Sequence, residues 1–214
     1  MFKSELLKLK NSIALYLIFI FTILEICTIP IYLHYINVEI SMTNLSIVTM
    51  LIYPILIVIL TIMSFEQEMS ANNFQEIKAN KKGKNILLVK FFVIDCLLFF
   101  PTAFIWLATG LIQNDIYTSL VIASASWLLS IFQNHIHGMM NFIIGKGENI
   151  LLSIIEILFI IFASNKALIG SYWCPVALPI NLILTGNITY VIITVFWIIL
   201  CTIILYALLS KKKK

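Results

Sequence analysis

Six apolar runs follow one another along this 214-residue chain, and they constrain its fold more than any other feature. They cover residues 11–33, 45–65, 85–112, 116–132, 150–163 and 188–209. A helix that crosses a bilayer needs about 20 predominantly apolar residues. Charged residues make up only 11% of the chain, whereas soluble domains carry about 25%. We therefore expect an all-α polytopic membrane protein with six transmembrane helices in a single domain, 1–214.

The lysines predict the orientation of these helices. All 14 basic residues are lysines, and they cluster beside the ends of the apolar runs. If both termini are cytoplasmic, thirteen of the 14 lysines lie inside and only Lys166 lies outside, as the positive-inside rule requires. Lysines in these places orient a protein in a lipid bilayer. They do not form a nucleic-acid surface, and we expect no nucleic-acid partner.

Residues 66–84 form the longest polar interruption and are predicted to be a cytoplasmic loop that docks a separate soluble protein. The orientation signal explains the lysines of this region. It does not explain the carboxylates at the membrane exit, nor a length sufficient for a short amphipathic helix. The candidate docking residues are Glu66, Glu68, Phe74, Glu76, Ile77, Lys78, Lys81 and Lys82, and the basic run continues through Lys84 and Lys90.

Two further segments are predicted to lie at the membrane surface. Residues 1–10 place apolar side chains against three lysines, which is typical of an amphipathic helix in the membrane interface. Residues 165–187 are broken by glycine and proline, yet they are too apolar to lie freely in water. We expect them to form an extracellular re-entrant hairpin between the fifth and sixth spans, with Tyr172 and Trp173 near its tip.

Three carboxylates, Glu25, Asp95 and Glu156, lie within the apolar runs. Each costs about 2.5–3.5 kcal/mol at the centre of a spanning helix, and such residues tend to face the interior of a bundle. One interpretation is a polar lining for a transport path or a cation-binding surface. The other is that each carboxylate packs against a polar neighbour or is protonated.

His135 and His137 lie in a mixed-polarity segment, 133–149, which is predicted to be a second cytoplasmic loop. The pair lacks a third metal ligand nearby, so a surface role is favoured over metal binding. The stretch around Lys146 lacks the upstream glycine and the following Ser or Thr of a phosphate-binding loop. We expect no catalytic, metal or cofactor site in this chain, and therefore no enzyme.

The order of these features resembles the permease subunits of type-2 (ABC-2) ATP-binding-cassette exporters. That family has an interfacial helix before six spans, a Glu-rich and then basic loop after the second span, and a re-entrant hairpin between the fifth and sixth. These features correspond here to 1–10, 65–90 and 165–187. The small size, the lysine- and isoleucine-rich composition and the opening FKSELLKLKNS are similar to lantibiotic-immunity permeases of the nisin-like G type.

The resemblance implies a permease subunit in the bacterial plasma membrane that expels a cationic antimicrobial peptide for self-immunity. Its implied partners are an ATPase subunit, which would carry ATP and Mg, and a second homologous permease. Residues 72–82 would be the main coupling helix. His135, His137, Lys146 and Glu148 would form the second cytoplasmic contact, and Tyr172 and Trp173 would lie near the exit.

Three alternatives stay open at this point. The chain fits an ABC-2 permease for another, lipid-like substrate equally well. A proton-coupled secondary transporter would use the buried carboxylates as proton sites and would work without an ATPase. A structural or regulatory membrane anchor would tolerate loss of those carboxylates.

Overall fold

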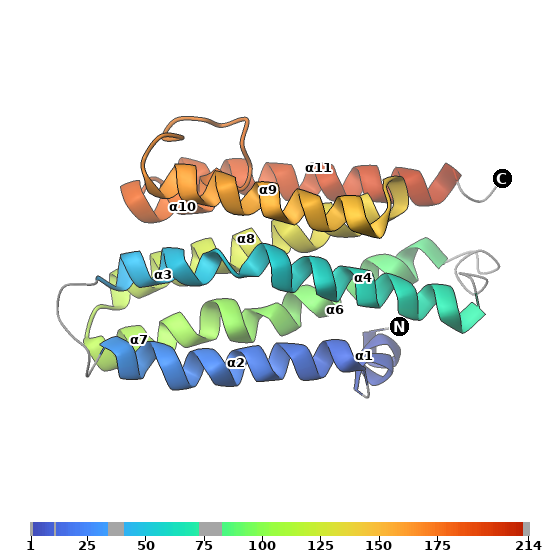
Figure 1. Ribbon diagram of the computed structural model, residues 1–214, viewed down its shortest axis with the longest axis horizontal. Coiled ribbons are helices and arrows are strands. Elements are labelled where there is room, and N and C mark those ends of the chain that lie inside the picture. The colour runs from blue at the N-terminus through green and yellow to red at the C-terminus, as the bar shows by residue number, and fades with distance from the viewer. Residues whose placement is uncertain (1, 11, 34–40, 73–82, 212–214) are drawn as a thin grey trace.

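The computed structural model describes residues 2–10, 12–33, 41–72 and 83–211, and all regular structure within these ranges is helical (Figure 1). The helices are α1 (Phe2–Leu9), α2 (Ile13–Ile31), α3 (Met42–Met50), α4 (Tyr53–Asn72), α6 (Gly83–Phe99), η2 (Phe100–Phe104), α7 (Ile105–Gln113), α8 (Ile116–Ile143), α9 (Lys146–Ser164), α10 (Ala177–Thr185) and α11 (Thr189–Lys211).

Six helical stretches are long and apolar enough to cross a membrane, which confirms that the chain is an all-α, multi-pass membrane protein. They are Ile13–Ile31, Met42–Ser70, Asn85–Gln113, Ile116–Ile143, Lys146–Ser164 and Thr189–Leu208. The end of the bundle that holds α1, the end of α4, the start of α6 and the end of α11 (Figure 1) is called the lysine end below.

The second span is a broken helix. Proline has no N–H, so Pro54 cannot donate to the carbonyl of Met50 one turn earlier. A turn at Leu51–Ile52 separates α3 from α4 at this point. The helix then continues to Asn72, so the expected end at residue 65 is too early by two turns. Glu66 and Glu68 therefore belong to a helix rather than to a loop.

The third span contains a second irregularity caused by proline. The π-helical turn η2 carries Pro101 between α6 and α7, and a wider turn accommodates a ring that would clash in a regular α-helix. Thr102 donates its hydroxyl proton to the Leu98 carbonyl at 2.7 Å. The turn packs against α8, and both Pro101 and Thr102 are buried there.

The fourth span is the largest departure from the sequence prediction. The apolar run was expected to end near residue 132 and to give way to a loop at 133–149. Instead α8 continues to Ile143, and its polar residues Gln133, Asn134 and His137 are fully buried. Asn134 and His137 bond to neighbouring helices, whereas the Gln133 side chain has no hydrogen-bond partner among the described residues. Only Ile144 and Gly145 separate α8 from α9.

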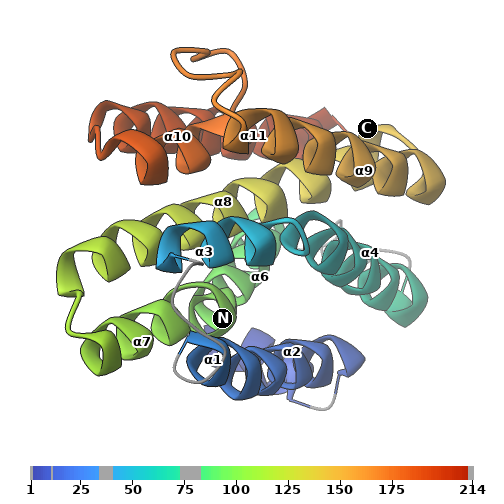
Figure 2. The same cartoon turned by 60° about the vertical axis from the view of Figure 1, so that its left-hand side comes forward.

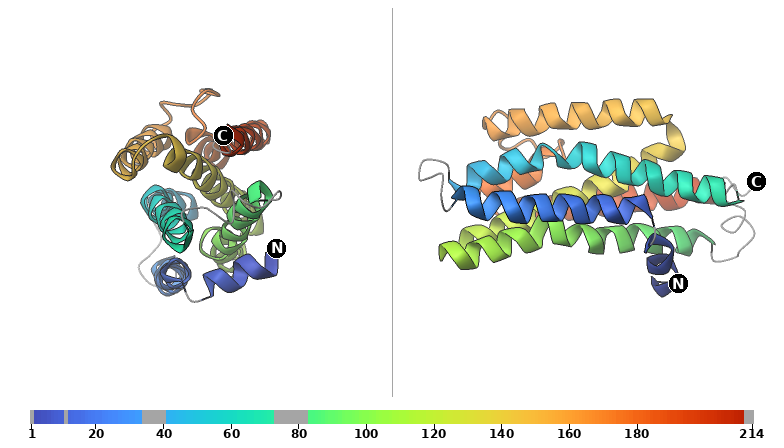
Figure 3. Two further views of the ribbon diagram at one scale, coloured as in Figure 1. Left: turned by 90° about the vertical axis from the view of Figure 1, so that its right-hand side faces the viewer. Right: turned by 60° about the horizontal axis from the view of Figure 1, so that its bottom comes forward.

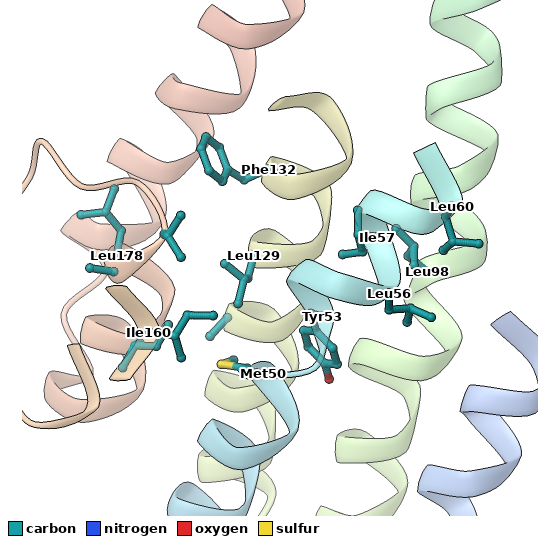
Figure 4. Close-up of a cluster of buried hydrophobic side chains, with 14 of the residues drawn as sticks. Met50, Tyr53, Leu56, Ile57, Leu60, Leu98, Leu129, Phe132, Ile160 and Leu178 are labelled. Carbon is teal, nitrogen blue, oxygen red and sulfur yellow. The ribbon is translucent and has the colours of Figure 1, made fainter. Parts of the chain in front are cut away.

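Helix α8 forms the centre of the bundle and packs against α3, α4, α6, α7, α9, α10 and α11. Figure 4 shows Leu129 of α8 with Met50 and Ile57 on one side and Ile160 and Leu178 on the other. All five side chains are fully buried. Helices α6 and α8 also pack closely at Gly138. A Cβ atom at this position would lie 2.2 Å from the Phe91 ring, so only glycine fits there.

Residues 165–187 consist of an irregular segment followed by the short helix α10. The segment 165–176 projects from the bundle, whereas α10 lies beside α11 and above α8 (Figure 2). Residues 177–182 of α10 are buried. The Asn181 side chain donates to the Leu168 carbonyl at 2.8 Å and so fixes the irregular segment to α10. No bilayer is present, so the re-entrant position of this hairpin stays a prediction.

Helix α1 lies across the lysine end rather than along the bundle (Figure 3). It packs against α6, where Phe2 meets the Phe92 ring with centroids 6.2 Å apart. Glu5 and Leu9 are buried, whereas Leu6 and Leu7 are exposed. The exposed apolar face suits a membrane interface, but the interfacial position of α1 stays a prediction.

Candidate functional site

The candidate site is a set of buried polar contacts centred on the lysine-end half of α8. Asn134, His135 and His137 lie within four residues of one another, yet the helix directs the two histidines toward different neighbours. Residues two apart on a helix do not share a face. The two imidazoles therefore cannot act as one chelating pair. Within the described ranges no group of three or more His, Cys, Asp or Glu side chains is arranged to hold a metal ion.

His135 joins α8 to α6 and α11. Its Nε2 lies 3.0 Å from Oδ2 of Asp95, and its Nδ1 lies 2.8 Å from the Thr202 hydroxyl. Thr202 donates its own proton to the Ile198 carbonyl at 2.7 Å, so it accepts from Nδ1–H of His135. The other carboxylate oxygen of Asp95 accepts from Asn134 Nδ2 at 2.7 Å. Asp95 is thus held by two adjacent residues of α8.

His137 joins α8 to α9. The Asn149 amide nitrogen donates to the His137 carbonyl and to Asn141 Oδ1, at 3.0 and 2.9 Å, so its Oδ1 is left as an acceptor. Nδ1 of His137 therefore carries a proton and donates to that oxygen at 2.8 Å. The second ring nitrogen, Nε2, lies 3.4 Å from Oε2 of Glu156. Glu156 is 3% exposed and His137 is fully buried.

The two histidine–carboxylate pairs differ in their contacts. In the His135–Asp95 pair, Nδ1 already donates to Thr202, so the 3.0 Å contact between Nε2 and Oδ2 requires a proton between these two atoms. In the His137–Glu156 pair, Nε2 faces Oε2 at 3.4 Å and makes no hydrogen bond. Two such pairs lie on one helix, and each connects it to a different neighbour. Buried acidic and histidine side chains of this kind can hold or pass protons within a membrane.

The three intramembrane carboxylates predicted from the sequence are therefore not brought together. Asp95 and Glu156 contact different histidines of α8. Glu25 stands apart on α2 and is 4% exposed. Neither of its oxygens has a hydrogen-bond partner among the residues that the structure describes. Among the described residues, the three carboxylates are not seen side by side along one transport path.

A second polar cluster ties the end of α4 to three other elements at the lysine end. The consecutive residues Glu66, Gln67 and Glu68 each reach a different partner. Glu66 pairs with Lys146 at the start of α9, and both side chains are about half exposed. Gln67 Nε2 donates to the Lys8 carbonyl of α1 at 3.4 Å. Glu68 pairs with Lys90 of α6 at 2.9 Å. We call this cluster the α4 junction.

Lys90 is the best-satisfied charge in the α4 junction. Its ammonium group donates to the Ser64 carbonyl at 3.0 Å, to Gln67 Oε1 at 3.4 Å and to Glu68 Oε1 at 2.9 Å. These contacts use all three ammonium protons. Lys90 is 4% exposed and Glu68 is 9% exposed. Both side chains are therefore buried against each other rather than turned to solvent, and the docking role of Glu68 stays a prediction.

The other residues predicted for docking have mixed outcomes. Lys146 and Glu148 are exposed at the start of α9, but His135 and His137 are buried and offer no surface to a partner. Phe74, Glu76, Ile77, Lys78, Lys81 and Lys82 lie outside the described residues. An open groove of about 350 Å³ lies beside the α4 junction, between the start of α2 and the end of α4. Glu66, Gln67 and Ser70 line its α4 side.

Tyr172 and Trp173 lie on the irregular segment before α10. Their side chains are 48% and 63% exposed. Trp173 contacts Phe159 edge-on, with ring centroids 6.2 Å apart, and Tyr172 meets Tyr190 at 5.8 Å. Exposed aromatic side chains anchored to spanning helices are typical of membrane–water interfaces.

Comparisons of the chain with family models, with curated proteins and with solved structures find no match. The family resemblance drawn from the sequence therefore rests on the order of its segments, on its size and composition, and on its opening residues. The residues of the candidate site that the sequence analysis missed are Asn134, Asn149 and Thr202, which contact the histidines and Asp95, together with Gln67. Their polarity within apolar surroundings was the available signal, because such residues in a membrane helix tend to face protein.

Proposed function

We propose that this chain is the permease subunit of an ABC-2 exporter that expels a cationic antimicrobial peptide from the bacterial plasma membrane. A separate ATPase would supply the energy, and a second homologous permease would complete the pathway. The observation that carries the proposal is the α4 junction. It lies immediately before residues 72–82, the segment predicted to dock the ATPase, and it connects α4 to α1, α6 and α9.

The α4 junction supports a mechanism in which a displacement of α4 also moves the helices that contact it. A force applied to residues 73–82 reaches α4 directly, because the helix continues to Asn72 without a flexible loop. The buried Glu68–Lys90 pair transmits it to α6. Contacts of Gln67 and Glu66 extend it to α1 and α9. Rigid coupling of this kind is what an ATP-driven permease requires from the helix beside its docking segment.

Exposed aromatic side chains on the segment before α10 favour an amphipathic peptide as the substrate. Tyr172 and Trp173 present aromatic surface beside α10, where an amphipathic peptide in the outer leaflet would meet the permease. Cationic side chains of such a peptide can bind aromatic faces through cation–π contacts. An ABC-2 permease for a different lipid-like molecule would share the α4 junction and would differ at this surface.

A proton-coupled secondary transporter is the second candidate function. Its specific support is the pair of histidine–carboxylate contacts on α8, which a transporter of this class would use as proton sites. A transporter of this class would work without an ATPase.

The substrate proposal is tested in the bacterium that carries the chain. Deletion of its gene should lower the nisin concentration that inhibits growth several-fold, and wild-type chain should restore resistance. A variant with 73–82 replaced by a Gly/Ser linker of equal length should not restore it. The matched control, with the same replacement at residues 34–40 of the sequence between α2 and α3, should restore it. Unchanged nisin sensitivity on deletion would refute the immunity function.

A further inference from the structure

Ser64 on α4 and Asn141 on α8 each carry a buried polar atom that the proposed function does not use. The Ser64 hydroxyl and the Asn141 Nδ2 have no hydrogen-bond partner among the described residues. Thr61 and Ser70 of the same helix, by contrast, each donate to a carbonyl of α4. Asn141 Oδ1 accepts from Asn149 Nδ2 at 2.9 Å, so the Asn141 amide nitrogen is left to donate elsewhere. A buried polar group normally has a partner, and both exceptions require an explanation.

Both residues line one small cavity at the lysine end of the bundle, which we call the Ser64 cavity. It lies between α4, α6 and α8 and has a volume of about 20 Å³. Glu68 and Lys90 of the α4 junction line it as well, and Leu87 supplies part of its apolar wall. A water molecule needs about 10–15 Å³ of such space. The Ser64 cavity therefore has room for one water molecule.

The polar groups of the Ser64 cavity suit water better than an ion or an apolar ligand. An anion would face the Glu68 carboxylate, and a cation would face the amide protons of Asn141. An apolar group would leave Ser64 and Asn141 unpartnered. A water molecule can accept from Asn141 Nδ2, donate to the Glu68 carboxylate and bond to the Ser64 hydroxyl. Three hydrogen bonds are typical of a buried water. Lys90 takes no part, because its three protons already have acceptors.

We propose that the Ser64 cavity binds a water molecule that joins the α4 junction to the His137 contacts of α8 and α9. On the far side of the water, Asn141 accepts from Asn149, which also donates to the His137 carbonyl at 3.0 Å. His137 Nδ1 in turn donates to Asn149 Oδ1 at 2.8 Å. The α4 junction contacts α1, α6 and α9 directly, and the water adds the central helix α8. Its role in moving α8 with α4 rests on the proposed function, whereas the water site itself depends only on the cavity.

Nuclear magnetic resonance of the isotope-labelled, full-length chain in lipid nanodiscs tests the site with solvent water as the probe. Wild-type chain should give a rotating-frame Overhauser cross-peak between water and the Asn141 Nδ2 protons, opposite in sign to chemical exchange. The matched control is Asn149, whose Nδ2 protons both donate to protein oxygens and should give no such peak. Ser64→Val places methyl groups where the water binds, so it should abolish the Asn141 peak. Unchanged Asn149 signals would show that this variant is folded. Absence of the peak in wild type, or an equal peak in Ser64→Val, would overturn the proposal.

The stability of two Ser64 variants distinguishes bound water from a dry apolar void. Ser64→Ala leaves the water with Asn141 and Glu68 as partners. Ser64→Val expels it and leaves the Asn141 amide unpaired, so its unfolding equilibrium constant should be about tenfold larger than that of Ser64→Ala. In a dry void, the added methyl groups would fill space and lower that constant instead.

The pair Ser70→Ala and Ser70→Val, at an exposed position of the same helix, measures the difference in helix propensity alone. If Ser64→Val is as stable as Ser64→Ala after this correction, or more stable, the cavity holds no water and the proposal is wrong. Neither measurement involves an ATPase or a peptide, so failure of the water site is distinguishable from failure of the proposed function.

Discussion

Replacing Lys90 with methionine should lower the free energy of unfolding by about 3–5 kcal/mol, because Glu68 would be left as a buried, unpaired carboxylate. The flexible methionine side chain occupies similar space, so the loss reflects charge rather than volume. Equilibrium unfolding in mixed micelles, monitored by circular dichroism, measures this change. The effect is large because the ammonium group makes three contacts inside the bundle.

Two further variants test this explanation. The double variant Lys90→Met/Glu68→Leu should recover most of the lost stability, since apolar replacement of a whole buried ion pair is often neutral or stabilising. Lys146→Met breaks the half-exposed contact with Glu66 and should cost only about 0–1 kcal/mol. If Lys90→Met costs no more than Lys146→Met, the Lys90 ammonium group is not buried in the α4 junction.

Replacing His137 with leucine is the second change with a large expected effect. It should lower the free energy of unfolding by about 3–5 kcal/mol, because it removes the partner of a buried carboxylate. Glu156 has no alternative partner within the described part of the chain. Asn149 also loses the donor to its Oδ1. The same unfolding assay measures the change.

Two control variants for His137→Leu change residues of α9. Removing both partners with His137→Leu/Glu156→Leu should restore most of the stability, because no unpaired charge remains. Ser153→Ala, one turn before Glu156, removes only a hydroxyl that bonds to the Ile150 carbonyl of its own helix. It should cost no more than about 1 kcal/mol. A double variant as unstable as His137→Leu alone would show that shape, rather than the charge pair, determines stability here.

The sequence predicted the helical class and the number of spanning helices because both depend on apolar runs, which are local. It failed where polar side chains are satisfied by distant residues. Residues 133–149 looked like a loop because the side-chain contacts in this region cannot be read from one segment. His135 contacts Asp95 and Thr202, and His137 contacts Asn149 and Glu156.

The end of the second span, at Glu66 and Glu68, illustrates the same point. Glu66 and Glu68 follow an apolar run, and their charges suggested that the helix had reached water. Lys90 lies 22 residues after Glu68 in the chain, and only the packing of α4 against α6 reveals the ion pair.

The central claim is that residues 72–82 bind an ATPase and that the α4 junction receives its motion. The most direct measurement is the ATP-hydrolysing activity that co-purifies with the tagged chain from native membranes in lipid nanodiscs. Activity should accompany wild-type chain and the 34–40 linker control, and it should be lost with the 73–82 linker. Equal activity with both linkers would contradict the claim. Absence of ATP hydrolysis from every preparation would contradict it as well, and the proton-coupled transporter would then be the better account.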